Sequence, residues 1–318
     1  DTALRQDIRP MKVLLLNLMP KKRETEVQFT RLLGNSPIQV ELTLMTTENY
    51  QSRNEERGYL EEFYITLDNI KDSFFDAFRK RRHYATTGAR IYLDVTARLG
   101  DQTLQIGDIV NTDQNQLDLS FNVIGTAPVE RVDIFNGMDL VQTIRPWNEH
   151  VSLNRLRVTC AGQHYRGRGR LVKWDVSANF SNGEISKVNA INFWNPNRQP
   201  QMISANKATW KTVTTGGASS VDFWLDDAAL AGNIDVQTNF EAWSSAVSEV
   251  TENGATVDCG GMDIRLHIER LPDVLDVRSV SGEQSFNLEH QSEQRLYIRV
   301  TQEDGHQAWS SPIYVQRV

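Results

Sequence analysis

Apolar residues in the first part of the chain follow the periods of both strands and helices. Residues 12–18 (KVLLLNL) are apolar on both faces, which is typical of a buried parallel strand. Residues 24–33 fit one face of a helix, and residues 38–44 (IQVELTL) predict a second strand. Residues 59–70 place apolar side chains three and four positions apart, the strongest helical stripe in the chain. The pattern predicts a β-α-β-α segment.

From residue 87 the period changes to two. Stretches such as RIYLDVTARLG, LDLSFNVIG, LNRLRVTCAG and RLYIRV alternate apolar and polar residues and are separated by turn residues. Ser181-Asn182-Gly183 predicts a hairpin turn, because Asn-Gly accepts positive φ angles. The ambiguous stretch FEAWSSAVSEV is predicted as strand. Strands at this spacing without intervening helices indicate an antiparallel sandwich or barrel.

The predicted fold class is therefore α+β, with a short N-terminal β-α-β-α segment followed by an antiparallel all-β, sandwich-like domain. The expected boundaries are 1–72 for the α/β segment, 73–88 for a helical junction and 89–318 for the β-rich domain, which has room for two sub-sheets.

Composition narrows the classes of partner. The net charge of −7 argues against nucleic acid, which favours a basic face. No apolar run approaches the roughly 20 residues that cross a bilayer, so no membrane partner is expected. The charges are also unevenly distributed. Residues 1–82 hold 14 Lys/Arg and 13 Asp/Glu, a balance of +1, and the remaining 20 and 28 give −8. All six histidines and both cysteines lie after position 82, which indicates two pieces of different origin.

The first piece resembles a known family. QDIRPMKVLLLNLMPKKRETEVQFTRLLGNSPIQVELTL, followed by YLEEFYITLDNIKDSFFD, is similar to the N-terminus of homoserine O-succinyl- and O-acetyltransferases over residues 2–76. The resemblance implies a flavodoxin-like α/β fold, methionine biosynthesis in the cytoplasm, acyl-CoA as a substrate and no bound cofactor. It implies a nucleophilic cysteine completed by a histidine and a glutamate. Lys21 and Lys22 match the lysines of the family's active-site region.

The second piece resembles another family. YATTGARIYLD, GTAPVERVDIFNG, YRGRGRLVKWD, INFWNP and LYIRVTQEDGHQAWSSPIYV are similar to the C-terminal β domain of a bacterial family of unknown function, over residues 74–318. That family is similar to PHP-type metal-dependent phosphoesterases. For this parent, export stays open as an alternative to the cytoplasm. Its metal-binding barrel precedes the β domain, so the resemblance implies a chain with the β domain alone. The six histidines are dispersed without a His-x-His pair, and no metal site is expected.

Neither parent's catalytic centre is complete in this chain. Residues 1–82 contain no cysteine or histidine, so this segment lacks a thiolate and its base. An acyltransferase reading would need Cys160 as nucleophile and His164 as base. Both fall in a strand and its turn rather than on a strand-to-helix elbow.

Other residues are candidates for ligand binding. Arg166, Arg168 and Arg170, interleaved with glycines, have the chemistry to bind phosphate or sugar acids, and they equally suit a solvated turn. Five tryptophans (Trp174, Trp194, Trp210, Trp224 and Trp309) suit either a carbohydrate platform or core packing. The preferred interpretation is a non-catalytic chimera whose β domain contacts protein or carbohydrate. The alternatives are a homoserine O-acyltransferase and a fragment of a metal-dependent phosphoesterase.

Overall fold

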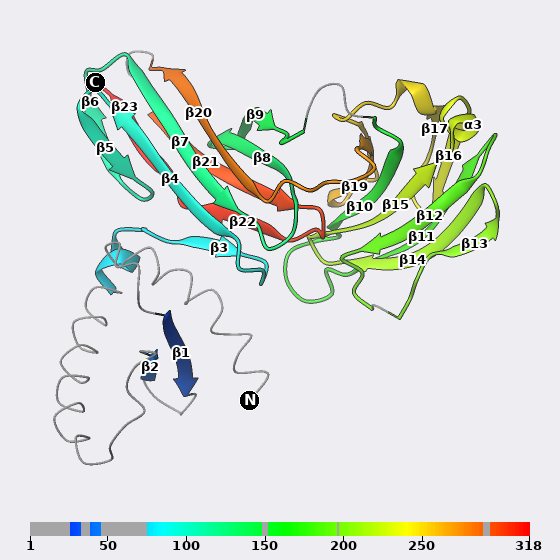
Figure 1. The fold of residues 1–318 in the computed structure, drawn as a ribbon, viewed down its shortest axis with the longest axis horizontal. Helices are drawn as coiled ribbons and strands as arrows, with labels where there is room; N and C mark the ends of the chain where they lie inside the picture. Colours follow the sequence, from blue (N-terminus) through cyan, green and yellow to red (C-terminus); the bar gives the residue numbers. More distant parts are fainter. Residues whose placement is uncertain (1–25, 33–38, 46–74, 148–151, 196, 289–292) are drawn as a thin grey trace. The chain divides into compact units, whose positions relative to one another are not determined.

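The computed structural model describes residues 26–32, 39–45, 75–147, 152–195, 197–288 and 293–318, with only the backbone for the first two ranges. The described residues are nearly all β (Figure 1). Their helices are short and comprise a helical turn at 75–79, α3 (Asp227–Leu230) and the 3-10 turn η1 (Val247–Glu249). Among these residues no helix has the length and apolar character needed to span a membrane.

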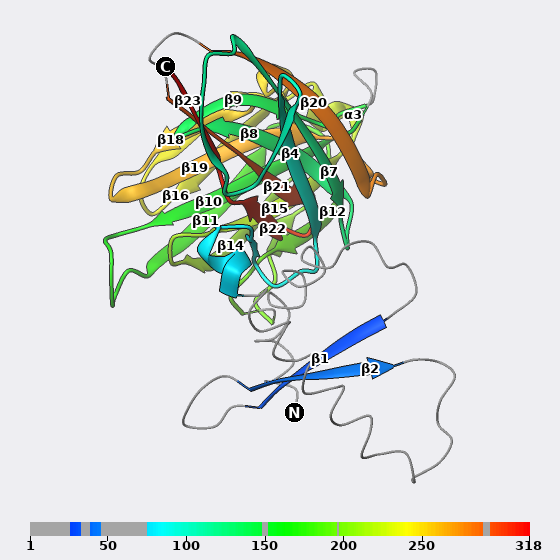
Figure 2. The ribbon, with the colours of Figure 1, turned by 90° about the vertical axis from the view of Figure 1, so that its left-hand side faces the viewer.

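The predicted α+β class and its N-terminal β-α-β-α unit are wrong. β1 (Glu26–Leu32) occupies the range predicted as a helix and pairs antiparallel with β2 (Gln39–Met45), as Figure 2 shows. The stretch EVQFTRL also alternates with period two, and Val, Phe and Thr favour strands, so its pattern fits both elements. The predicted strand at 12–18 and helix at 59–70 lie outside the described residues.

Two units account for the described sheets. Unit 1 comprises Asp1–Pro146 and Val277–Val318, and unit 2 comprises Trp147–Asp276. Unit 2 is therefore inserted between two sequence-distant parts of unit 1.

Besides the β1-β2 pair, the described part of unit 1 has two larger sheets around one core. The first has the order β20-β7-β4-β5, and the second has the order β3-β22-β21-β23-β6, with β8 paired to β21 and β9 paired to β8. Buried apolar residues of both sheets form a single cluster, as expected of a sandwich. The bounds are β3 (Tyr84–Thr86), β4 (Tyr92–Leu99), β5 (Gln102–Gln105), β6 (Ile109–Thr112), β7 (Gln116–Ile124), β8 (Val129–Asn136), β9 (Asp139–Ile144), β20 (Ser279–Asn287), β21 (Glu293–Gln302), β22 (Gln307–Ser310) and β23 (Ile313–Arg317).

Unit 2 is a second sandwich with its own core. Its sheets have the orders β12-β15-β10-β19-β18 and β13-β14-β11-β16-β17, and all their pairs are antiparallel. Side chains from both sheets form one buried cluster that includes Trp174, Phe180 and Phe223. The bounds are β10 (Arg155–Gln163), β11 (Val172–Phe180), β12 (Ile185–Ile191), β13 (Gln201–Ser204), β14 (Lys207–Thr214), β15 (Ala218–Leu225), β16 (Asn233–Thr238), β17 (Ala242–Ala246), β18 (Ala255–Asp258) and β19 (Met262–Leu271).

The turn at 181–183 is not a hairpin turn. β11 and β12, the strands that it joins, belong to different sheets of unit 2, so the chain crosses from one layer to the other. Gly183 has the predicted positive φ, +68°. Its neighbour across the turn is the start of α3, where the Asp226 side chain accepts a hydrogen bond from the Ala229 N–H. An Asn-Gly signal therefore marks the tight turn without identifying the partner of the strand that follows.

Candidate functional site

The residues expected from the acyltransferase resemblance are only partly visible. Lys21 and Lys22 lie outside the described residues. Cys160 lies on β10, fully buried in the core of unit 2, where burial raises the pKa of its thiol. A raised pKa keeps the thiol protonated, and burial keeps substrates from it.

His164 does not act on Cys160 in this structure. It follows the end of β10 and is exposed, with its backbone N–H donating to the Arg170 carbonyl at 3.2 Å. Its ring lies 6.2 Å from the ring of Phe240, centroid to centroid. No hydrogen bond joins Cys160 to His164 among the described residues, so the nucleophile–base pair is not assembled there.

Both cysteines are free thiols. Cys259 is half-buried, and desolvation raises the pKa of its thiol as well. Its Sγ lies 3.7 Å from the Val257 carbonyl oxygen, a weak hydrogen bond within its own strand end.

The arginine-rich stretch is an exposed connection between β10 and β11. Arg166, Arg168 and Arg170 are all exposed, and within the described part of the chain none of them forms an ion pair. Gly167 and Gly169 have positive φ values of +102° and +81°. These angles favour glycine, which explains the interleaved pattern.

The tryptophans divide between core and surface. Trp174 and Trp210 are buried in the unit 2 core, which fits the packing interpretation. Trp224 lies under two cations, with Lys187 Nζ 4.1 Å and Arg155 Cζ 5.2 Å from its ring centroid. Trp194 is 74% exposed and lies in the turn after β12.

A polar row that the sequence reasoning missed crosses the face of the β12-β15-β10-β19-β18 sheet opposite the unit 2 core. Arg157 donates from Nε to Asp222 Oδ1 at 2.6 Å and from Nη2 to Oδ2 at 3.0 Å. Arg155 Nη1 lies 3.4 Å from the same carboxylate. All three side chains are buried, so the bidentate ion pair between Arg157 and Asp222 is shielded from solvent. The alternation of Arg155, Arg157 and Thr159 along β10 was the available signal.

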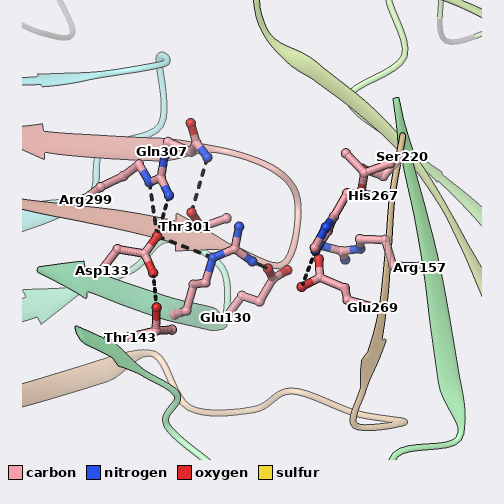
Figure 3. Close-up of polar contacts among 12 residues, drawn as sticks. Glu130, Asp133, Thr143, Arg157, Ser220, His267, Glu269, Arg299, Thr301 and Gln307 are labelled. Atoms are coloured by element: carbon pink, nitrogen blue, oxygen red, sulfur yellow. Dashed lines mark hydrogen bonds and ion pairs between the residues drawn. The ribbon is translucent and has the colours of Figure 1, made fainter. Parts of the chain in front are cut away.

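One row further along, a histidine lies between a hydroxyl and a carboxylate. His267 Nδ1 is 2.8 Å from Thr256 Oγ1. Its Nε2 is 3.7 Å from Glu269 Oε2 (Figure 3). The second distance is too long for a hydrogen bond, so Glu269 does not orient the imidazole as a catalytic base requires. The neighbouring Thr159 and Ser220 hydroxyls form a hydrogen bond with each other at 2.8 Å.

Unit 1 has a separate polar cluster around a buried carboxylate. Asp133 accepts hydrogen bonds from Thr143 Oγ1 at 2.8 Å and from Arg299 Nη2 at 2.7 Å (Figure 3). Arg131 Nε lies 3.4 Å from the same carboxylate, and Arg131 also pairs with Glu130. Such a network suits a stabilising role, because every charge has an opposite charge beside it.

The side chains that could bind a metal ion are dispersed over the described residues. No group of three or more His, Cys, Asp and Glu side chains there has the geometry to hold a metal ion. The ring of His83 stacks on Phe78 at 5.2 Å, and His306 Nδ1 lies 2.9 Å from Thr87 Oγ1. Each of these histidines has a local packing or hydrogen-bonding partner.

The N-terminal part of the chain is similar to known proteins. The family model for homoserine O-succinyltransferase matches residues 1–91. Homoserine O-acetyltransferases from Clostridium novyi and Bacillus subtilis are 53% and 51% identical over 74 residues, which is 23% of this chain and 24% and 25% of theirs. The enzyme of the same name from Chelativorans sp. is 48% identical over 99 residues, 30% of each chain. No solved structure matches this chain.

The predicted N-terminal resemblance is thereby confirmed. The N-terminal segment is similar to homoserine O-acyltransferases, and this chain spans between 24% and 30% of the length of these relatives. The second resemblance, over residues 74–318, stays a prediction.

Proposed function

We propose that this chain does not transfer acyl groups and that its β-rich part has a binding role. In this proposal the acyltransferase-like segment stops before the family's nucleophile. The β-rich part corresponds to the C-terminal β domain of the PHP-like family. The observation that carries the proposal is the burial of Cys160, the thiol that the acyltransferase alternative needs.

Chemistry supports this choice over the acyltransferase alternative. An acyl-enzyme forms when a thiolate attacks the thioester carbonyl of acyl-CoA and coenzyme A leaves. Cys160 has no exposed surface and its pKa is raised by burial, while Cys259 is half-buried with its pKa also raised. Neither thiol therefore has the lowered pKa and the access of a catalytic cysteine.

The test is the mass of the intact folded chain after incubation with acetyl-CoA or succinyl-CoA. We expect no acyl adduct on the wild type and none on Cys160→Ser. A stoichiometric adduct that Cys160→Ser abolishes would overturn the proposal. An adduct that persists in this variant and disappears in Cys259→Ser would overturn it equally.

The proposal includes a composite origin for the chain. We place the join within residues 71–78 (KDSFFDAF), where the second predicted resemblance begins. The charge balance changes from +1 before position 83 to −8 after it. Single long reads of the source DNA across these codons test the join. We expect every read to be continuous, and reads that diverge inside this stretch would show that the two pieces belong to separate proteins.

A further inference from the structure

The loops at one end of unit 2 bring together the exposed arginines and the exposed tryptophan. β10 and β12 both flank β15 and run in the same direction. Their last residues, Gln163 and Ile191, therefore lie at the same end of the sheet. Strands two places apart in a sheet are separated by about 10 Å. The connection 164–171 and the turn that begins at Asn192 are therefore neighbours.

Hydrogen bonds tie these loops to the turn between β14 and β15. The Gly162 N–H donates to the Gly217 carbonyl at 3.2 Å, and the Gly216 N–H donates back to the Gly162 carbonyl at 3.0 Å. Asn192 Nδ2 donates to the Ala218 carbonyl at 2.7 Å. Both loops are thus fixed to the same short segment of backbone.

The arginine loop is held in shape by its own residues. The hydrogen bond from the His164 N–H to the Arg170 carbonyl closes its base. The Tyr165 hydroxyl lies where a side chain at Gly169 would stand, 2.6 Å from a Cβ placed there. His164 contacts Phe240, whose ring lies 4.9 Å from that of buried Trp174 in an edge-on arrangement. A loop anchored in this way loses little conformational entropy on binding.

The exposed side chains at this end have complementary chemistry. Arg166, Arg168 and Arg170 present three guanidinium groups without ion-pair partners among the described residues, and each suits a carboxylate. Trp194 is 74% exposed and Tyr165 is 53% exposed. Exposed aromatic side chains of this kind offer broad, rigid, amphipathic contact area.

From this juxtaposition we propose that the loop end of unit 2, formed by residues 164–171 and 192–195, binds an acidic polysaccharide built from uronic acids. The arginines pair with the carboxylates, and Trp194 stacks on the sugar rings. The inference rests on the proposed binding role and names its ligand class.

Charge density favours a uronic acid polymer over nucleic acid. Double-stranded DNA carries one charge per about 1.7 Å of its axis, so the net negative charge of the chain repels it more strongly than a polymer of lower charge density. The residues after position 82 carry a balance of −8 in all. A polymer with one carboxylate per sugar ring carries fewer charges per unit length, and its carboxylates pair with the three arginines. Its sugar rings stack on the exposed aromatic side chains.

The experiment measures binding of the full chain to polygalacturonate by calorimetry. Dextran serves as the neutral polymer and poly-L-glutamate as an acidic polymer without rings. We expect binding to polygalacturonate that weakens with salt, and at least several-fold weaker binding to both other polymers. Absence of binding, or equal binding to dextran or poly-L-glutamate, would overturn the proposal.

Two matched variant pairs test the residues. Replacing Arg166, Arg168 and Arg170 together by Gln should weaken polygalacturonate binding by about tenfold or more, since even one lost charge-assisted hydrogen bond has about that effect. The control replaces three exposed arginines of unit 1, Arg90, Arg98 and Arg295, by Gln and removes the same charge. Equal losses in the two triple variants would contradict the proposed site.

Trp194→Ala should weaken binding several-fold, and Met138→Ala, at a residue 95% exposed in unit 1, should leave it unchanged. Unaltered binding by Trp194→Ala would remove the stacking contact from the proposal. Circular dichroism of each variant verifies that it is folded. These outcomes do not depend on acyl transfer, so a failure here is distinct from a failure of the proposed non-catalytic role.

Discussion

Arg157 and Asp222 form a bidentate ion pair between adjacent strands of unit 2. They are register partners on β10 and β15, and their two hydrogen bonds measure 2.6 and 3.0 Å. Both side chains are buried, and Arg155 adds a second cation 3.4 Å from the same carboxylate. The Asp222 carboxylate therefore lies beside two arginines on this face of the sheet.

Asp222→Asn should destabilise the chain by about 3–5 kcal/mol, the usual cost of removing one partner of a buried ion pair. The control is Asp175→Asn, since Asp175 pairs with Lys211 in solvent, where the two side chains are 58% and 70% exposed. Its cost should stay within about 1 kcal/mol. Urea unfolding of the two variants measures both values, and similar midpoints would show that the buried pair contributes no more than a surface pair.

The two thiols should differ in reactivity because their burial differs. Native chain treated with iodoacetamide at pH 8 should be alkylated slowly at Cys259 and not at Cys160, whose thiol is fully buried with a raised pKa. Both should react at once in denaturant. Peptide mass analysis locates the label, and rapid labelling of Cys160 in the folded chain would contradict the described core.

Asp118 should make stability depend on acid pH. Hydrogen bonds from Ser285, Gln116 and Arg98 lower the pKa of its carboxyl to about 2. A group whose folded pKa is depressed stabilises the fold above its unfolded pKa, and this contribution is lost as pH falls through the folded value. Asp118→Asn should therefore lower the melting temperature at pH 6, and the difference from wild type should shrink between pH 4 and 2. A difference that stays constant over that interval would refute the assignment.

Gly183 should be far less tolerant of substitution than Gly137. Both have positive φ, +68° and +62°. An added Cβ at Gly183 would overlap Ala229 N and Asp226 Oδ1, whereas at Gly137 it would meet nothing within 4 Å. Gly137→Ala should cost about 1–2 kcal/mol from backbone strain alone, and Gly183→Ala clearly more. Equal costs in chemical unfolding would show that the contact at the start of α3 relaxes freely.

Local patterns predicted strands in this chain better than they predicted how the strands assemble. The period-two stretch LDLSFNVIG forms most of β7 as expected. The ambiguous FEAWSSAVSEV, predicted as strand, contains β17 followed by η1. The pairing of β12 with β15 instead of β11 follows from which side chains fill the core between the two sheets, which no single segment encodes. For residues 26–32 the same side chains satisfy helix and strand periods, and the local pattern could not decide between them.

The candidate site shows the same limit. The sequence singled out the arginine-rich stretch and, as one of five tryptophans, Trp194. It gave no sign that the two are neighbours, because their proximity arises from strand order. It missed Asp222, since a carboxylate in the stretch ASSVDFWL gives no sign that its partner, Arg157, lies 65 positions earlier. The alternation of Cys160 with Thr159 along the strand indicates that the two side chains lie on opposite faces of the sheet. It does not indicate which face is buried, because that depends on where the second sheet packs.

The most direct test of the central claim is a turnover assay with the purified full chain, homoserine and either acetyl-CoA or succinyl-CoA, with O-acylhomoserine detected by mass spectrometry. We expect no product above the level of a sample without protein. Product that forms in proportion to chain concentration, and that disappears in Cys160→Ser, would contradict it.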